Sequence, residues 1–424
     1  MANHREGGLS LGRNMLWNSA GSLFYFACQY LPTILVVRLA AGLTASGVFN
    51  YAMNTTNAFL TVAVYGMRTF QVSDLDAKYT DRAYLASRWL TSAAALAACA
   101  GYGALVGLDG ETLAALVLFM LFRVGEALVD VYSGIDQRAG RMDVIGRSFF
   151  ARGALSCAAF AGILASGGSI LLAIAGMAAA SLAVALLFDR RWAARLSRPG
   201  GRCDAVFPLL AECAPLMVYS FLNTAVSTIP RQFLQLWQGT GATAVYGSIT
   251  APTVILQLGA TYLFTPLIGL FATRWQAGRR REYARLFLLV LAGIAAIGAA
   301  GFVGVALLGR WGLALLYASG ENGRQILENA PLLFPMVGCT ILTALVLFCN
   351  MLLTIQRQFK ALVAANLAGI AASVALSAAL VGRLSMWGAS FALAGSLAVQ
   401  AVFLLIFGVA GAAVHFNEKG CADS

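Results

Sequence analysis

Apolar runs of membrane-spanning length recur along almost the whole chain, and they constrain its fold more than any other feature. A helix of about 20 apolar residues crosses the roughly 30 Å of hydrocarbon in a bilayer. Hydrophobic residues make up 60% of the 424 residues and charged residues only 11%, unlike a soluble domain. The sequence therefore predicts an all-α polytopic membrane protein with about 12 transmembrane helices, which we place at 15–37, 45–66, 89–107, 112–133, 149–166, 169–188, 209–236, 244–270, 286–308, 331–354, 361–381 and 386–410.

Basic residues are distributed unevenly between the predicted loops. The chain has 29 Lys and Arg and a formal net charge of +11. Most basic residues lie near the N-terminus, in alternate loops and in the C-terminal tail, whereas the loops assigned to the outside hold only Arg38, Arg310, Arg324 and Arg383. The positive-inside rule then places both termini in the cytoplasm. Basic loops beside a membrane set topology and contact lipid headgroups, so membrane lipids are expected partners and nucleic acid is not.

Motifs for catalysis and for metal or nucleotide binding are missing from the sequence. The two histidines, His4 and His415, lie outside the predicted spans, and there is no H-E-x-x-H, no C-x-x-C and no Walker A sequence. No outside loop is long enough to hold an active-site domain. We therefore expect no metal, no cofactor and no enzymatic activity, and transport becomes the leading class of function.

Two short sequence echoes indicate that the chain is built from two similar halves. "GLTASGVFNYAMNTT" (42–56) can be laid on "GTGATAVYGSITAPT" (239–253), and "QRAGR" (137–141) on "QRQFK" (356–360). Six helices per half would give the halves the same orientation, related by a pseudo-twofold axis along the membrane normal and enclosing a central cavity. The expected organisation is an N-terminal six-helix half, a basic cytoplasmic linker, a C-terminal six-helix half and a cytoplasmic tail, at 1–188, 189–208, 209–410 and 411–424.

Polar residues follow helical spacing on the first two predicted helices of each half. Each set advances by three or four residues and therefore forms one stripe along its helix. Such residues can simply hold helices together, at about 1 kcal/mol per contact. Four stripes on corresponding helices favour a shared water-filled cleft instead. The candidate cavity residues among them are Gln29, Asn54, Asn57, Asn223 and Gln257.

Arginines at or near bilayer depth favour an anionic cargo. Arg123 stands in the middle of the predicted fourth helix, Arg231 lies within the seventh, and Arg38 is near the outer end of the first. Charges inside a membrane are costly and usually face protein or water. A guanidinium group binds phosphate through two parallel hydrogen bonds and keeps its charge. We therefore take Arg38, Arg123 and Arg231 as candidate cargo-binding residues.

Two acidic residues share a helix face with Arg123. Glu126 and Asp130 follow it at spacings of three and four residues. One interpretation is an intrahelical ion pair between Arg123 and Glu126, which would leave Asp130 as the free acid. Glu126 and Asp130 are accordingly the candidates for coupling transport to an ion.

Four segments of the sequence resemble the polysaccharide transport family, the Wzx-type flippases of O-antigen and exopolysaccharide. They are the opening "NMLWNSAGSLFYFACQYLPTILVVRLAAG", "GVFNYAMNTTNAF" (47–59), "GMRTFQVSD" (66–74) and "QRAGRMDVIGRSFFARG" (137–153). The R-M-D-x-I core of the last segment is the most specific. This family belongs to the multidrug/oligosaccharidyl-lipid/polysaccharide exporter superfamily, and the resemblance extends over nearly the whole chain.

The resemblance implies a cargo and a location. The cargo would be an oligosaccharide on a polyprenyl diphosphate, moved by alternating access from the inner to the outer leaflet of the bacterial cytoplasmic membrane. The sugar and diphosphate would occupy a cationic cavity while the polyprenyl tail stays in lipid. A polysaccharide polymerase and a chain-length regulator would be protein partners.

Two other functions stay open at this stage. One is a drug or metabolite cation antiporter of the same superfamily, which would need an excess of acidic groups in its cavity. The other is a polymerase or scaffold component of a polysaccharide assembly complex.

Overall fold

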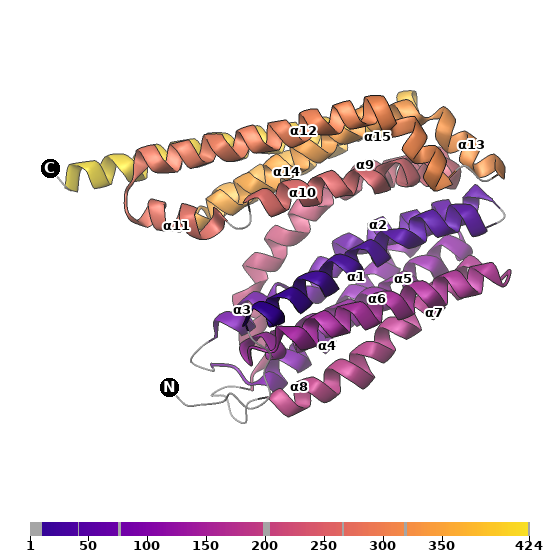
Figure 1. Cartoon of the computed structure of the whole chain (residues 1–424), viewed down its shortest axis with the longest axis horizontal. Coiled ribbons are helices and arrows are strands. Elements are labelled where there is room, and N and C mark those ends of the chain that lie inside the picture. Colours follow the sequence, from indigo (N-terminus) through magenta and orange to yellow (C-terminus); the bar gives the residue numbers. More distant parts are fainter. Residues whose placement is uncertain are drawn as a thin grey trace. The chain divides into compact units, whose positions relative to one another are not determined.

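A computed structural model of the chain describes residues 11–40, 42–74, 78–197, 204–264, 267–317 and 320–422. These residues fold into helices joined by short turns (Figure 1). The first nine elements are α1 (Leu11–Leu39), α2 (Leu43–Val64), α3 (Met67–Ser73), α4 (Asp81–Leu105), α5 (Gly110–Arg138), α6 (Met142–Ala165), α7 (Ile170–Ala183), the π-helical η1 (Val184–Asp189) and α8 (Arg190–Leu196). The others are α9 (Val206–Thr250), η2 (Ala251–Thr253), α10 (Val254–Phe264), α11 (Ile268–Gln276), α12 (Arg280–Tyr317), α13 (Gly320–Glu328), η4 (Ala330–Leu332), α14 (Leu333–Ile355) and α15 (Phe359–Ala422).

The number of membrane-length helices agrees with the sequence-based prediction. Among the described residues, eight continuous helical stretches are long and apolar enough to cross a membrane. Two of them are broken internally, α9 at Gly239 (φ 78°) and α15 at Ser385 (φ 50°), so each supplies two helices. Helices α2 and α4 complete a set of 12 in the described part of the chain. The predicted class, an all-helical polytopic membrane protein with six helices in each half, is confirmed.

The chain packs as two compact units, Met1–Phe221 and Leu222–Ser424. The division falls inside α9 because the first turns of this helix belong to the core of the first unit. There Leu209 and Cys213 pack with Met67 and Tyr84. The predicted linker at 189–208 is also partly helical, since η1 reaches Asp189, α8 follows it and α9 begins at Val206.

The two sequence echoes fall at matching positions in the order of helices. Gly42 directly precedes α2, and Gly239 is the break after which α9 resumes. Gln137 lies in the last turn of α5, and Gln356 directly follows α14. The first echo therefore marks the start, and the second the C-terminal end, of corresponding helices in the two halves.

Helices α1 and α6 of the first unit cross at two glycines. A Cβ atom added to Gly21 would lie 2.2 Å from the carbonyl oxygen of Gly146, and one added to Gly146 would lie 2.1 Å from that of Trp17. Such backbone approach is possible only for residues without a side chain. The crossing positions the site because Tyr25 lies one turn beyond Gly21 on α1, and the Tyr25 side chain there contacts residues of α6.

A methyl group at this crossing is expected to destabilise the first unit. Gly146→Ala should lower the free energy of unfolding by about 1–3 kcal/mol, because the helices must move apart to admit it. Gly162→Ala is a matched control on the same helix, since a Cβ there has nothing within 4 Å. Thermal unfolding of the purified protein in detergent measures both. Equal stability of the two variants would show that the backbones of α1 and α6 leave room for a methyl group at Gly146.

The second unit is held by aromatic packing at one end and by amides in the middle. Phe271 of α11, Tyr283 of α12, Phe348 of α14 and Phe416 of α15 form one buried cluster. The amides, described below, lie on α9, α14 and α15. This unit thus differs from the first, whose interior carries charges.

Candidate functional site

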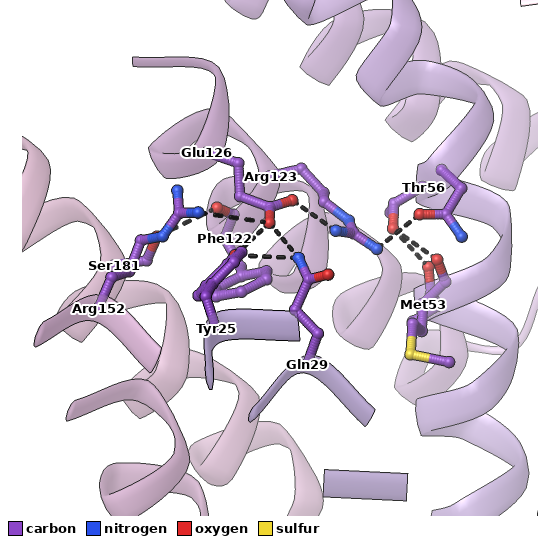
Figure 2. Close-up of polar contacts among 11 residues, drawn as sticks. Tyr25, Gln29, Met53, Thr56, Phe122, Arg123, Glu126, Arg152 and Ser181 are labelled. Atoms are coloured by element: carbon purple, nitrogen blue, oxygen red, sulfur yellow. Dashed lines mark hydrogen bonds and ion pairs between the residues drawn. The ribbon is translucent and has the colours of Figure 1, made fainter. Parts of the chain in front are cut away.

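A buried ionic network around Glu126 joins four helices of the first unit. The carboxylate accepts hydrogen bonds from the Tyr25 hydroxyl and the Gln29 amide of α1 and forms an ion pair with Arg123 of α5 (Figure 2). Arg152 of α6 lies on its other side, with Nη2 3.9 Å from Oε1. Figure 2 shows the carboxylate between the two guanidinium groups.

Arg123 extends this network from α5 to α2. Its Nη2 donates a hydrogen bond of 2.6 Å to Oδ1 of Asn57. The guanidinium carbon lies 5.3 Å from the ring centroid of Phe119 and 5.8 Å from that of Phe122, within the range of cation–π attraction. Arg123 therefore forms the intrahelical pair with Glu126 that the spacing allows, and it also reaches a second helix.

Arg152 is the most buried charge of the network and the one with the most unused hydrogen-bonding capacity. Only 2% of its surface is exposed, and its guanidinium carbon lies 3.9 Å from the ring centroid of Tyr25. Within the described residues, its Nε and Nη1 atoms have no hydrogen-bond partner. Buried donors without acceptors are costly, so this group is able to bind an acceptor that enters the site.

The network has an excess of positive charge. Among the residues that the structure describes, Glu126 is contacted by two guanidinium groups, those of Arg123 and Arg152. One carboxylate balances one of them, and the other stays uncompensated within the network. In a low-dielectric interior this arrangement attracts anions and repels cations.

The structure brings four of the predicted site residues together and places one nearby. Gln29, Asn57, Arg123 and Glu126 belong to the network. Asn54 lies about one turn from Asn57 on α2, where its amide donates to the carbonyl oxygen of Asn50.

Arg38 lies apart from this network. It is exposed in the last turn of α1, nine residues beyond Gln29, which corresponds to roughly 14 Å along a helix.

The prediction that Asp130 stays a free acid is wrong. Its Oδ2 lies 2.8 Å from Nη2 of Arg88, and its Oδ1 lies 3.7 Å from Nη1 of Arg68. Arg88 is fully buried on α4 and also donates to the carbonyl oxygen of Ala63. Asp130 is thus the counter-ion of a buried arginine from another helix, a partner that helical spacing alone does not indicate.

The remaining predicted residues lie in the second unit. Asn223 of α9 accepts hydrogen bonds from Asn350 of α14 and Gln400 of α15, at 3.1 and 3.2 Å. Gln400 also donates to Asn366 at 2.9 Å. Arg231 is half-buried on α9, with its guanidinium carbon 5.9 Å from the ring centroid of Tyr246. Gln257 is half-buried on α10.

Removing the amide acceptor at the centre of the second unit should weaken that unit. Asn223→Leu leaves the amides of Asn350 and Gln400 without their shared acceptor, and we expect a loss of about 1–3 kcal/mol in the free energy of unfolding. Asn329→Leu is the control, because this half-buried amide donates to the backbone carbonyl oxygen of Gln325, on its own helical turn, and not to an amide of another helix. Chemical unfolding in mixed micelles measures the difference, and an unchanged Asn223→Leu midpoint would contradict it.

Sequence reasoning did not include Arg152 or Tyr25 among the site residues. The sequence predicts that the fifth helix begins at residue 149, which would leave Arg152 at the membrane surface. Helix α6 begins at Met142 instead. Arg152 then lies ten residues inside it, or roughly 15 Å along the axis. The R-M-D-x-I segment at 141–145 contains this helix start, because Asp143 lies in the first turn of α6 and pairs with Arg141 at 2.8 Å.

Comparisons with known proteins identify the fold. No protein-family model and no curated protein matches the sequence. Solved structures match over nearly the whole chain. One is a multidrug resistance MATE family transporter of the MOP superfamily in an inward-facing conformation, with a TM-score of 0.68, 13% identity, and coverage of 91% of this chain and 94% of that one. Another is a multidrug resistance MATE family transporter in an outward-facing conformation. Its TM-score is 0.64 and its sequence identity 13%, and the match covers 97% of this chain and 99% of that one.

A third neighbour is described by the polarity of its binding pocket. It is a MOP superfamily transporter from Pyrococcus furiosus whose binding pocket is described as having reverse polarity, which suggests a different function. Its TM-score is 0.59 and its sequence identity 12%, and the match covers 96% of this chain and 95% of that one. The chain therefore has the fold of MOP superfamily transporters.

Proposed function

We propose that the protein is a flippase that moves a polyprenyl-diphosphate-linked oligosaccharide from the cytoplasmic to the outer leaflet of the bacterial inner membrane. It would do so by alternating access, in the biosynthesis of O-antigen or exopolysaccharide. The observation that carries the proposal is the buried network with two guanidinium groups, one carboxylate and two guanidinium nitrogens of Arg152 without acceptors.

The chemistry of a diphosphate diester suits this network. Its two phosphate groups carry negative charge and several acceptor oxygens, which the planar fork of a guanidinium binds in pairs. Glu126 balances the charge of one of the two arginines while no cargo is bound. Phosphate oxygens would take over the free donors of Arg152, and the amides of Gln29 and Asn57 lie close enough to bind further oxygens of the headgroup.

Access to the network requires movement of α1. Tyr25 and Gln29 of this helix cover Glu126, and Arg152 is almost fully buried beneath Tyr25. Pro32 lies inside α1, two turns from Tyr25, and a proline within a helix permits bending because it removes a backbone hydrogen bond. Bending at Pro32 would uncover the guanidinium groups on one side of the membrane at a time.

A multidrug or metabolite antiporter of the same superfamily is the second candidate, favoured by the neighbours described as multidrug resistance transporters. Such a protein binding cationic drugs needs a carboxylate that is available to the drug. Glu126 is instead held by two arginines, and Asp130 by Arg88 and Arg68. The charge of the first unit therefore favours the anionic cargo.

The test compares lipid-linked intermediates in a strain that lacks the gene. A flippase defect should leave oligosaccharide-diphosphate lipid on the cytoplasmic leaflet, inaccessible to an external glycosidase, and should remove surface polysaccharide. Single units accumulating on the outer leaflet would indicate a polymerase or scaffold component instead. Normal polysaccharide together with altered drug sensitivity would overturn the proposal in favour of the antiporter.

A further inference from the structure

Two buried aspartates lie at the end of the first unit where its basic loops gather. Asp136 is in the last turns of α5, and Asp189 closes the π-helical segment η1. Asp136 is fully buried and 1% of Asp189 is exposed. The two carboxyl groups lie within electrostatic range of each other. Within the described residues, both oxygens of Asp136 and Oδ2 of Asp189 have no hydrogen-bond partner.

Buried hydroxyl groups accompany these carboxylates. Ser148 of α6 lies beside Asp189, and Ser133 precedes Asp136 by about one turn on the same face of α5. The Ser148 hydroxyl lies where it can donate to the Asp189 carboxylate, whereas the Ser133 hydroxyl oxygen has no hydrogen-bond partner in the described part of the chain, and both residues are at most 1% exposed. Polar groups so fully buried are normally paired, so the four side chains point to a small bound species.

The charges around the pair are engaged elsewhere. Arg141 forms a bidentate pair with Asp143, Arg68 donates to Gln137 and faces Asp130, and Arg152 faces Glu126. The titratable and charged groups within electrostatic range of the two aspartates are Arg68 of α3, Tyr132 of α5, Arg141 of the turn after α5, and Asp143 and Arg152 of α6. Arg190 of α8 follows Asp189 in the chain and lies within range of Tyr132. None of these cations, among the described residues, forms a direct ion pair with either aspartate.

We infer that Asp136 and Asp189 form a proton-binding site in which the pair of carboxyl groups holds one proton. Two neighbouring carboxylates that are buried without a direct ion pair repel each other, and one proton removes the repulsion by neutralising one of them. The proton forms an O–H bond on one carboxyl group, and the other carboxyl group stays ionised. No group other than the proton is gained or lost.

The site is linked to the ionic network through Arg152, which lies within electrostatic range of Asp189 as well as of Glu126. An ionised Asp189 compensates the excess positive charge of that network, whereas a protonated Asp189 leaves it free for an anion. Bound anion and bound proton therefore favour each other, and the effect is reciprocal. This second step rests on the proposed function, whereas the proton site itself rests only on the geometry of the aspartates.

Infrared difference spectroscopy of the purified protein without cargo tests the proton site. We expect a buried carboxylic acid C=O band at about pH 7 that disappears on titration to high pH. Asp136→Asn and Asp189→Asn should each abolish the band, because the remaining carboxylate then has an amide donor beside it. Glu111→Gln, which removes an exposed acid on the same helix, should leave the band unchanged. Absence of the band in the unmodified protein would overturn the inference and needs no variant. A band that shifts with Na⁺ but not with K⁺ would also overturn it, since the site would then hold a metal cation.

Calorimetry with a P1,P2-dialkyl diphosphate diester, whose charge is constant in this pH range, tests the linkage. Affinity should fall with rising pH by at most roughly tenfold per pH unit, because anion binding takes up one proton. Asp136→Asn should remove this dependence. A carboxylic acid band without any diester binding would support the proton site and contradict the proposed cargo. Diester binding whose affinity does not depend on pH, in a protein without the carboxylic acid band, would contradict the proton site and support the proposed cargo.

Discussion

Arg152→Gln is expected to stop delivery of the lipid-linked cargo to the outer leaflet while the protein still inserts and folds. The variant removes the uncompensated guanidinium but leaves the neutral pair of Arg123 and Glu126 intact. A charge-assisted hydrogen bond contributes about 1.5–3 kcal/mol, and the site loses at least one such bond to the diphosphate, so transport should fall by at least about tenfold. The rate of cargo appearance at the outer face of proteoliposomes measures this.

Two further variants of α6 make this result specific. Arg147→Gln removes a half-exposed arginine that faces Asp143 on the same helix, and it should transport normally. Arg152→Lys keeps the charge but not the planar fork, so it should recover only part of the activity. Full transport by Arg152→Gln would show that this guanidinium does not bind cargo.

Glu126→Ala is expected to have the largest effect on stability of any single substitution in the first unit. It leaves the guanidinium groups of Arg123 and Arg152 buried together without a counter-ion and removes the acceptor of Tyr25 and Gln29. Breaking a buried ion pair from one side costs about 3–5 kcal/mol. The midpoint of thermal unfolding in detergent should fall accordingly, whereas Glu111→Ala, at an exposed position of the same helix, should have little effect.

Replacing the whole charged triad separates its structural role from its transport role. Methionine at Arg123, Glu126 and Arg152 together should restore most of the stability lost in Glu126→Ala, because no unpaired charge then stays buried. The triple variant should still fail to transport. A stable triple variant with normal transport would mean that the charges serve only the fold.

The helices could be predicted from sequence because a membrane leaves the chain few alternatives. Backbone groups in hydrocarbon must bond within the segment, so a long apolar run becomes a helix. Local spacing also indicated the pair of Arg123 and Glu126 correctly. The helix breaks at Gly239 and Ser385 fall between predicted spans, 209–236 and 244–270 for the first and 361–381 and 386–410 for the second, so the apolar runs alone separate these helices.

Contacts between helices limited what the sequence could reveal about the site. The pairing of Asp130 could not be predicted from helical spacing, because its partner Arg88 lies 42 residues away in the sequence, on α4. Arg152 was missed because the start of α6 was placed too late, and the amides that meet Asn223 come from α14 and α15. In each case the decisive partner lies on another helix, where periodicity within one segment carries no information.

Binding of a diphosphate diester to the purified protein in lipid nanodiscs tests the central claim most directly. If the buried arginines form an anion site, the diester should bind saturably, Arg152→Gln should weaken it by at least about tenfold, and tetraphenylphosphonium should not compete. Equal affinity of the variant and the unmodified protein, or binding of the organic cation in place of the diester, would contradict the account.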